Sequence, residues 1–200
     1  MNDPLAPVTP RAEFRVFGQG LIDIVQQRIW DAGATLQKVR AMPAETYVIS
    51  RHTDAANVKV RSGVLDIKLK TGETHEGYEI FKPIGKAAFP IPHAALASIF
   101  DDLHAATPPQ QPTYTLDELR SLVHGHPDLT RMRVEKMRNG FTVNRVICEY
   151  ARVLFNGALM ETACCESEHY AELKPVIEAL GIAGLPNTSY VKAAQRILGM

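Results

Sequence analysis

Residues 57–70 of this 200-residue chain read Asn-Val-Lys-Val-Arg-Ser-Gly-Val-Leu-Asp-Ile-Lys-Leu-Lys. Side chains along a β-strand alternate between its two faces, and Ser62-Gly63 is a typical two-residue hairpin turn. Two strands joined at this turn would place five apolar residues on one face: Val58, Val60, Leu65, Ile67 and Leu69. The opposite face would carry Asn57, Lys59, Arg61, Asp66, Lys68 and Lys70. The stretch therefore predicts a hairpin with one core face and one mainly cationic face, which is suited to a polyanion such as phosphate groups.

Strand-like patterns recur on both sides of this hairpin, and helical patterns lie between and after them. We expect further strands over residues 12–17, 46–52, 78–81, 132–137, 140–143, 146–155 and 159–168. Helical spacing of apolar residues predicts helices over residues 21–30, 91–105, 115–124, 170–180 and 189–198. Many antiparallel strands with few helices favour a closed or nearly closed barrel with the helices packed outside. The predicted fold class is therefore α+β, an antiparallel barrel with flanking helices.

Local signals predict where several of these elements begin and end. Asn139-Gly140 and Asn156-Gly157 are both strong hairpin-turn signals. The polar segment 71–74 predicts a turn after the basic hairpin. Thr115, followed three residues later by Glu118, matches a capping box and predicts a helix start.

Length and composition favour one domain of ordinary size. Residues 1–10 contain three prolines and are interpreted as an irregular arm, and residues 11–200 as a single domain. Lys plus Arg equals Asp plus Glu, 22 each, which argues against a protein that binds extended nucleic acid. The start does not have the pattern of a signal peptide, and apolar runs stay far below the roughly 20 residues that span a bilayer. We therefore expect a cytoplasmic protein without membrane contact; the sequence carries no signal for its oligomeric state.

The cysteines favour a reducing compartment. Cys148, Cys164 and Cys165 leave one thiol over and lack Cys-x-x-Cys spacing, so neither a disulfide framework nor a zinc site is expected. Because Cys164 and Cys165 are adjacent on an expected strand, they should point to opposite faces.

Carboxylates gather on the last two expected strands. Glu166 and Glu168 are two residues apart and therefore share a face, and Glu149 on the preceding strand could face the same interior. Glu13 would join them if the first strand lies alongside. Carboxylate oxygens are the ligands that magnesium and manganese prefer. The pattern thus predicts Mg²⁺ or Mn²⁺ held by Glu13, Glu149, Glu166 and Glu168, and the alternative interpretation is a solvated strand edge.

Two further cations, Lys136 and Arg138, share one face of the strand expected near residues 132–137. They would extend the cationic surface if that strand belongs to the same interior. The alternative interpretation is an exposed basic strand.

Taken together, these residues resemble the CYTH superfamily, also called triphosphate tunnel metalloenzymes, from residue 13 to residue 198. Its members begin with a Glu-x-Glu-x-Lys strand, where this chain has Arg11-Ala12-Glu13-Phe14-Arg15. The basic hairpin, Lys136-x-Arg138, then Glu149 with Glu166-x-Glu168, and a late Ser189-Tyr190 helix start follow in the family's order. The resemblance implies a tunnel of about eight antiparallel strands that binds a triphosphate inside and holds a divalent metal with its glutamates.

The first strand departs from the family pattern. Arg11 occupies the place of the first glutamate and Arg15 that of the lysine, and a register shifted by one repeat still leaves one carboxylate missing. An arginine in place of a carboxylate reverses the local charge and weakens the binding of a divalent cation.

The leading hypothesis is a metal-dependent phosphohydrolase that acts on inorganic triphosphate or on an organic or nucleoside triphosphate. Glu166, Glu168 and Lys68 would have catalytic roles. The phosphate-binding residues would be Arg15, Lys59, Arg61, Lys68, Lys70, Lys136 and Arg138. The alternative is a non-catalytic module that binds a polyanion or nucleotide in the same tunnel. A third hypothesis is a protein-interaction domain whose lysine and glutamate walls pair with each other and leave no open cavity.

Overall fold

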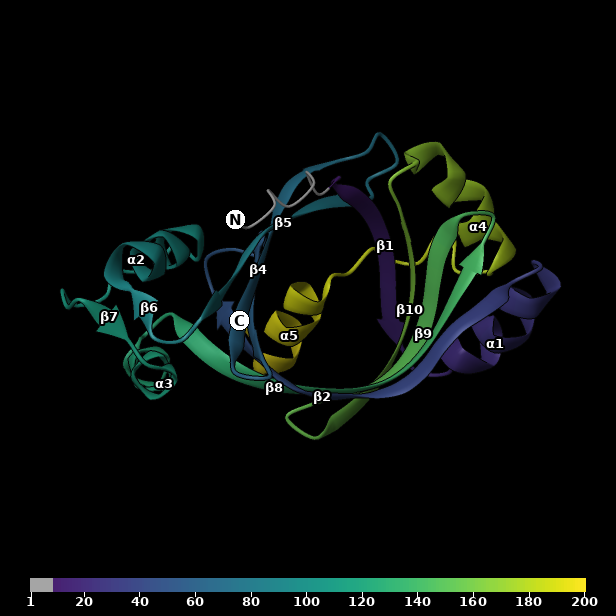
Figure 1. The fold of residues 1–200 in the computed structure, drawn as a ribbon. Helices are drawn as coiled ribbons and strands as arrows, with labels where there is room; N and C mark the ends of the chain where they lie inside the picture. Colours follow the sequence, from purple (N-terminus) through teal and green to yellow (C-terminus); the bar gives the residue numbers. More distant parts are fainter. Residues whose placement is uncertain (1–8) are drawn as a thin grey trace.

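A computed structural model describes residues 9–200; most of the expected irregular arm, residues 1–8, lies outside the described residues. Its centre is a closed barrel of antiparallel strands in the order β1-β10-β9-β8-β2-β3-β4-β5, which confirms the predicted fold class (Figure 1). These eight strands are β1 (Arg11–Gly18), β2 (Thr35–Ser50), β3 (Ala56–Arg61), β4 (Val64–Glu73), β5 (Glu79–Ala88), β8 (Leu129–Val143), β9 (Val146–Phe155) and β10 (Ala158–Ser167). The short strands β6 (Ile91–Pro92) and β7 (Thr113–Tyr114) pair with each other outside the barrel.

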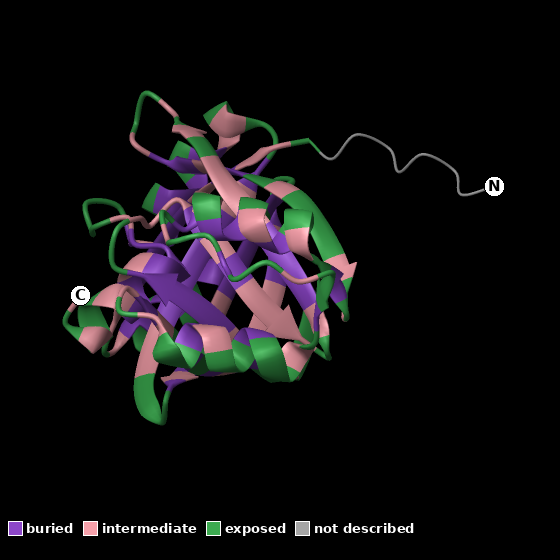
Figure 2. Ribbon diagram, turned by 90° about the vertical axis from the view of Figure 1, so that its left-hand side faces the viewer, coloured by how far each residue is buried: buried purple, intermediate pink, exposed green. Residues whose placement is uncertain are grey.

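Two pairs of helices cover the outside of the barrel. Helices α1 (Leu21–Asp31) and α4 (Leu173–Ala179), the latter preceded by the short helix η1 (Tyr170–Glu172), pack on the outward side chains of β1, β9 and β10. Helices α2 (His93–Asp102) and α3 (Leu116–Gly125) pack on β3 and β4. Figure 2 shows the strands largely buried or half-buried, while exposed residues lie on the helices' outer sides and on turns. No described helix combines the length and the apolar character that a membrane crossing needs.

The last helix lies inside the ring of strands rather than outside it. Helix α5 (Tyr190–Leu198) is seen within the barrel in Figure 1, and Ser189 caps its start by accepting a hydrogen bond from the Lys192 amide at 3.3 Å. Its apolar face packs on interior side chains of β2, β8 and β9, forming a core of its own. The helix therefore fills one part of the barrel interior, and the charged side chains line the part that it leaves open.

The basic hairpin forms as predicted. Asn57 pairs with Lys68 and Lys59 with Asp66 across β3 and β4. Ser62 and Gly63 take φ angles of 50° and 74°, the left-handed geometry that a tight hairpin turn requires. Val58 and Leu65 on the other face join the outer core under α2 and α3, so the cationic face points into the barrel.

The prediction of a turn at Asn139-Gly140 is wrong. Both residues lie inside β8, where Asn139 pairs with Val39 of β2 and Gly140 pairs with Lys38. The chain instead turns at Asn144-Arg145, with φ angles of 45° and 67°. Hydrogen bonding to strands on both sides outweighs the local turn preference. The turn predicted at Asn156-Gly157 is confirmed.

Other boundaries also differ from the sequence prediction. The strand expected over 46–52 is only the end of β2, whose first residues are exposed and lack a clean alternation. The segment 71–73 belongs to β4, and the turn falls at residues 74–77. Helix α2 begins at His93 because the two residues before it pair with β7. The capping box at Thr115 is confirmed, with both of its reciprocal hydrogen bonds present.

Candidate functional site

The interior side chains of seven strands (β1–β5, β8 and β10) and the start of α5 enclose a cavity of about 160 Å³. Because alternate residues of a barrel strand face inward, one face of β1, β3, β4 and β8 delivers its cations to the same space. Six of the seven predicted phosphate-binding residues line it: Arg15, Lys59, Arg61, Lys68, Lys136 and Arg138. The remaining lining residues are Glu13, Tyr47, Asn57, Asp66, Phe81, Glu166, Ser189 and Tyr190.

A buried carboxylate, Glu45, lies behind the cations of β3 and β8. Its oxygens are 3.7 Å from Lys59 Nζ, 3.3 Å from Arg61 Nη1 and 2.6 Å from Lys136 Nζ. Burial alone would raise the pKa of Glu45, but Lys136 and Lys59 outweigh it and lower the pKa. Glu45 is therefore ionised, and its single charge is shared among three cations.

Lys136 makes the shortest of these three contacts with Glu45, and its pKa is lowered all the same. Its ammonium donates to Glu45 at 2.6 Å and to the Tyr47 hydroxyl at 2.9 Å, and it lies 4.0 Å from the ring centre of Tyr190. Burial, followed by the nearby Lys59 ammonium, nevertheless lowers the pKa of Lys136 to about 7. Burial also lowers the pKa of Lys59. The lowered pKa values show that the cavity walls disfavour the positive charges of Lys136 and Lys59.

Three polar groups of the cavity have no partner in the described part of the chain. Within residues 9–200, the Lys68 ammonium makes neither an ion pair nor a hydrogen bond with another side chain. The Tyr190 hydroxyl and Asn57 Oδ1 are buried and likewise unpaired in this part of the chain. Buried polar groups are normally hydrogen-bonded, so Tyr190 and Asn57, together with the half-buried Lys68 of the same cavity, mark a place where a bound molecule would complete the bonding.

The carboxylates predicted to hold a metal are all in ion pairs with arginines. Arg15 Nε donates to Glu13 at 2.7 Å, and Arg15 and Arg138 both contact Glu149. Burial raises the pKa of Glu13, but the Arg15 guanidinium outweighs this effect and lowers it. Arg11 contacts the other two carboxylates, lying 3.2 Å from Glu166 and 3.1 Å from Glu168.

This donor set does not fit a resident divalent metal. A hard cation needs several carboxylate oxygens free to turn toward one point, and here a guanidinium occupies that place. No group of three or more His, Cys, Asp or Glu side chains among residues 9–200 is arranged to hold a metal ion. Only Glu13 and Glu166 of the four predicted ligands line the cavity; Glu149 lies behind Arg138, and Glu168 lies at the rim.

The Arg11 end of the barrel is the mouth of the cavity. A smaller cavity of about 110 Å³ is lined there by Thr9, Arg11 and Pro83, and it shares Glu13, Lys68, Phe81 and Glu166 with the main cavity. The two spaces therefore adjoin, with the unpaired Lys68 between them.

Lys70, the seventh predicted phosphate-binding residue, lies away from the cavity. Its ammonium pairs with Glu73 at 2.6 Å and with Glu79 at 3.1 Å, and Glu79 also accepts from Lys192 of α5. Lys70 lies on the same face of β4 as Lys68, two residues further along the strand. At that position its ammonium contacts carboxylates of β4 and β5 and not the cavity.

Sequence reasoning missed the lining residues Tyr47 and Tyr190, and Glu45 behind the cations. Glu45 and Tyr47 share a face of β2, but the predicted strand began at residue 46 and so separated them. Tyr190 was noted only as part of a helix start, because nothing local shows that α5 enters the barrel. A carboxylate and a tyrosine two residues apart at the start of an alternating run could have signalled an interior pair.

The three cysteines are free and buried. Cys164 faces the interior beside Arg15, whereas Cys148 and Cys165 lie in the outer core, so the predicted opposite orientation of Cys164 and Cys165 is confirmed. Burial raises the pKa of the Cys164 thiol well above its usual value, which favours the unreactive protonated form.

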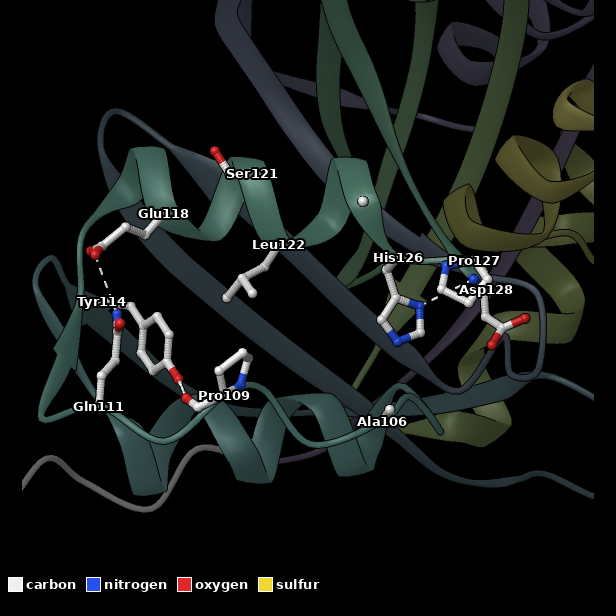
Figure 3. A pocket seen from close by; sticks show the side chains of 11 residues that line it. Ala106, Pro109, Gln111, Tyr114, Glu118, Ser121, Leu122, His126, Pro127 and Asp128 are labelled. Carbon is white, nitrogen blue, oxygen red and sulfur yellow. Dashed lines mark hydrogen bonds between the residues drawn. The ribbon is translucent and has the colours of Figure 1, made fainter.

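A larger cavity, of about 570 Å³, lies outside the barrel between α3 and the connector that precedes it (Figure 3). Its walls are mainly apolar, with Tyr114 and Pro109 facing Leu122, and His126 at the far end. None of the predicted site residues lines it, so its size does not make it the centre of the predicted chemistry.

The chain matches no protein-family model, and its sequence matches no curated protein. Several solved structures align with most of the chain at low sequence identity. The PH1012 protein of Pyrococcus horikoshii OT3 is 17% identical, with a TM-score of 0.48, over 92% of this chain and 98% of that one. A candidate adenylate cyclase of Bacillus halodurans is 12% identical, with a TM-score of 0.49, over 93% of this chain and 98% of that one.

A candidate adenylyl cyclase of Hippeastrum, described as having a dominant triphosphatase activity, is also 12% identical. Its TM-score is 0.49, and the match covers 96% of each chain. Likeness at this level concerns the shape of the chain and carries no argument about activity. Membership of the CYTH superfamily therefore stays a prediction, while the barrel that it implies is present.

Proposed function

We propose that the cavity inside the barrel, called the tunnel from here on, binds a small polyanion of the oligophosphate class. A triphosphate group is its best-fitting member. One observation carries this proposal: six cations converge on a closed space in which Lys68, Asn57 and Tyr190 have unsatisfied polar atoms among the described residues. Phosphate oxygens accept charge-assisted hydrogen bonds from lysine and arginine, and the anion would offset the burial and the neighbouring Lys59 charge that lower the pKa of Lys136.

The cavity size favours a compact ligand. Its volume of about 160 Å³ is below the roughly 300–1,000 Å³ that is typical of pockets for drug-sized molecules. An oligophosphate chain could occupy this space, while any organic group attached to it would extend through the mouth near Arg11 and Lys68. The third hypothesis, a salt-bridged interior without an open cavity, accounts for Glu45 and Glu149 but leaves Lys68 unexplained.

The first test measures triphosphate binding by isothermal titration calorimetry in the presence of a metal chelator. We expect Lys68→Met to weaken binding about tenfold to a hundredfold, because it removes an unpaired, charge-assisted donor. The matched control is Lys82→Met, an exposed lysine of β5 whose strand position faces outward.

Two results would overturn this proposal. One is the absence of binding by the unaltered protein. The other is an equal loss in the Lys68 and Lys82 variants, which would show that general surface charge and not the cavity attracts the ligand.

Metal-dependent hydrolysis of the bound triphosphate is the second candidate function. It is favoured by the position of Glu13 and Glu166, which are neighbours across β1 and β10 and line both cavities together with Lys68. It requires Arg11 and Arg15 to release their carboxylates, and this requirement makes binding without hydrolysis the better-supported function.

Phosphate release separates the two functions. Inorganic triphosphate, thiamine triphosphate and ATP are incubated with magnesium or manganese, and the control carries Glu166→Gln together with Glu168→Gln. Metal-dependent release that is lost in this control would establish hydrolysis and assign Glu166 and Glu168 to it. Binding without release, retained in the control, would establish a non-catalytic module.

A further inference from the structure

A second group of cations lies on the outside of the barrel, between α3 and the first half of β8. These residues surround a cavity of about 370 Å³, separate from the tunnel. Its lining residues are Thr46, Arg120, Val123, His124, Leu129, Thr130, Arg131, Arg133 and Asn156. Three of them are arginines, and none of these nine is an aspartate or glutamate. The tunnel, by contrast, mixes cations with carboxylates.

The alternation of side chains along β8 and the helical repeat of α3 place these cations on one wall. Met132 and Val134 of β8 point into the inner core, so Arg131 and Arg133 between and before them point outward. Arg120 and His124 are one turn apart on α3 and therefore lie on the same side of that helix. Val123 and Leu129 pack together in the outer core and hold α3 against β8.

The arginines are available to a ligand. Arg131 makes no ion pair or hydrogen bond through its side chain with any residue from 9 to 200. Arg120 pairs with Asp117 and Arg133 with Glu135, but these carboxylates are 87% and 43% exposed. Exposed pairs of this kind contribute little free energy, so a phosphate group can compete for both guanidinium groups.

Asn156 adds an oriented neutral donor to this wall. Its side-chain Oδ1 accepts a hydrogen bond from the backbone N–H of Arg133 at 2.8 Å, and its backbone N–H donates to the Arg133 carbonyl at 2.8 Å. These two bonds fix the turn between β9 and β10 against β8. The side-chain NH₂ group of Asn156 takes no part in either bond, so it can donate to a ligand.

We propose that this outer cavity is a second anion site, which binds the phosphate groups of a small phosphorylated molecule. Three arginines line one recess that has no carboxylate in its lining, and a guanidinium group recognises phosphate oxygens in pairs. The volume of about 370 Å³ accommodates a diphosphate or a phosphate ester. The outer site and the tunnel lie on opposite faces of the same two strands: Arg133 pairs with Thr46 facing out, while Val134 pairs with Glu45 facing in.

The test uses pyrophosphate as the probe, titrated calorimetrically into the full chain with a chelator present. Arg131→Gln removes a guanidinium that has no partner among residues 9–200, so it should weaken binding at the outer site by about tenfold or more. Arg152→Gln is the matched control: it removes an exposed arginine of β9 that does not line the cavity, and it should leave the affinity unchanged. Thermal unfolding of both variants, followed by circular dichroism, verifies that each is folded.

A third variant separates this site from the tunnel. In Lys68→Met, binding of pyrophosphate at the outer site should persist, and adding Arg131→Gln to that variant should weaken it by the same factor as in the unaltered protein. Loss of all binding in Lys68→Met alone, or equal effects of Arg131→Gln and Arg152→Gln, would overturn the outer site. If the tunnel binds no pyrophosphate, the unaltered protein shows a single class of site. Arg131→Gln then weakens binding, whereas Lys68→Met and Arg152→Gln do not. Failure of the tunnel proposal is therefore distinguishable from failure of the outer site.

Discussion

Lys136 is a cation placed where the protein interior disfavours cations. It is buried, it shares the single carboxylate of Glu45 with Lys59 and Arg61, and its pKa is lowered to about 7. Removing charges from water is costly unless each is fully compensated, and three cations around one carboxylate are not. A polyanion in the cavity would supply the missing negative charge, so occupancy of the tunnel and protonation of Lys136 are coupled.

This coupling predicts a pH dependence of binding. Above about pH 7, free Lys136 loses its proton and the bound polyanion restores it, so affinity should fall as pH rises, by up to about tenfold per pH unit. The measurement is calorimetric titration of triphosphate across this pH range. Lys136→Met is the control for ionisation of the ligand itself, and its affinity should change less with pH. Equal pH dependence in both proteins would contradict the coupling.

The same pKa shift has a consequence for stability in the absence of ligand. The unfolded chain holds this proton up to the ordinary value of 10.5, whereas the folded chain releases it near 7. Between these values the unfolded state binds more protons, so the free energy of unfolding contributed by Lys136 increases as pH rises. The expected sign is therefore a gain in stability relative to Lys136→Met as pH is raised from about 7 toward 10.5.

At the scale of single elements, local and non-local signals fared differently. The capping box at Thr115 was predicted correctly because its hydrogen bonds join residues three apart and need no other part of the chain. Asn139-Gly140 was misread as a turn because the strands that pair on both sides of β8 are distant in sequence. A local preference decides an element only where tertiary pairing does not compete.

Thr115→Ala should lower the free energy of unfolding by about 1 kcal/mol, because the amide of Glu118 loses its hydrogen-bond acceptor. Urea unfolding followed by circular dichroism measures this change. Ser121→Ala, at an exposed position in the middle of the same helix, should cost less, since alanine has the higher helix propensity. Equal losses in the two variants would show that the cap does not stabilise α3.

At the scale of the whole molecule, the decisive feature is the helix inside the barrel. Helix α5 buries Val191 and Ala194 against the interior side chains of β2, β8 and β9, and Tyr190 packs on Phe17 and Phe155. The helix thereby divides the interior into an apolar part and a charged part. The tunnel cavity is the space that α5 leaves open, with Ser189 and Tyr190 forming its floor.

Phe155→Ala should destabilise the whole protein by about 3–5 kcal/mol, because the ring is 0% exposed and lies between β9, β1 and α5. Ile147→Ala on the same strand is the comparison: that side chain is 40% exposed, and its loss should cost far less. Urea unfolding monitored by far-ultraviolet circular dichroism and by tyrosine fluorescence should give coincident transitions. Separate transitions would show that α5 detaches from the barrel before the strands unfold.

The sequence by itself determined the faces of the strands. Alternation is a property of the extended backbone, so the cationic side of residues 57–70 and the shared face of Lys136 and Arg138 could be read before any contact was known. The barrel class followed from the number of such strands, and it is confirmed. These features depend on spacing alone.

Only the tertiary structure decided which charges neutralise one another. The sequence placed Arg11 beside the predicted metal ligands, but the closed barrel brings its guanidinium between Glu166 and Glu168, and Arg15 between Glu13 and Glu149. It also brought Glu45 under three cations, kept Lys70 out of the cavity and left Lys68 in it without a partner among the described residues. Ion pairing depends on distances across strands that are far apart in the chain, and those distances exist only once the barrel has closed.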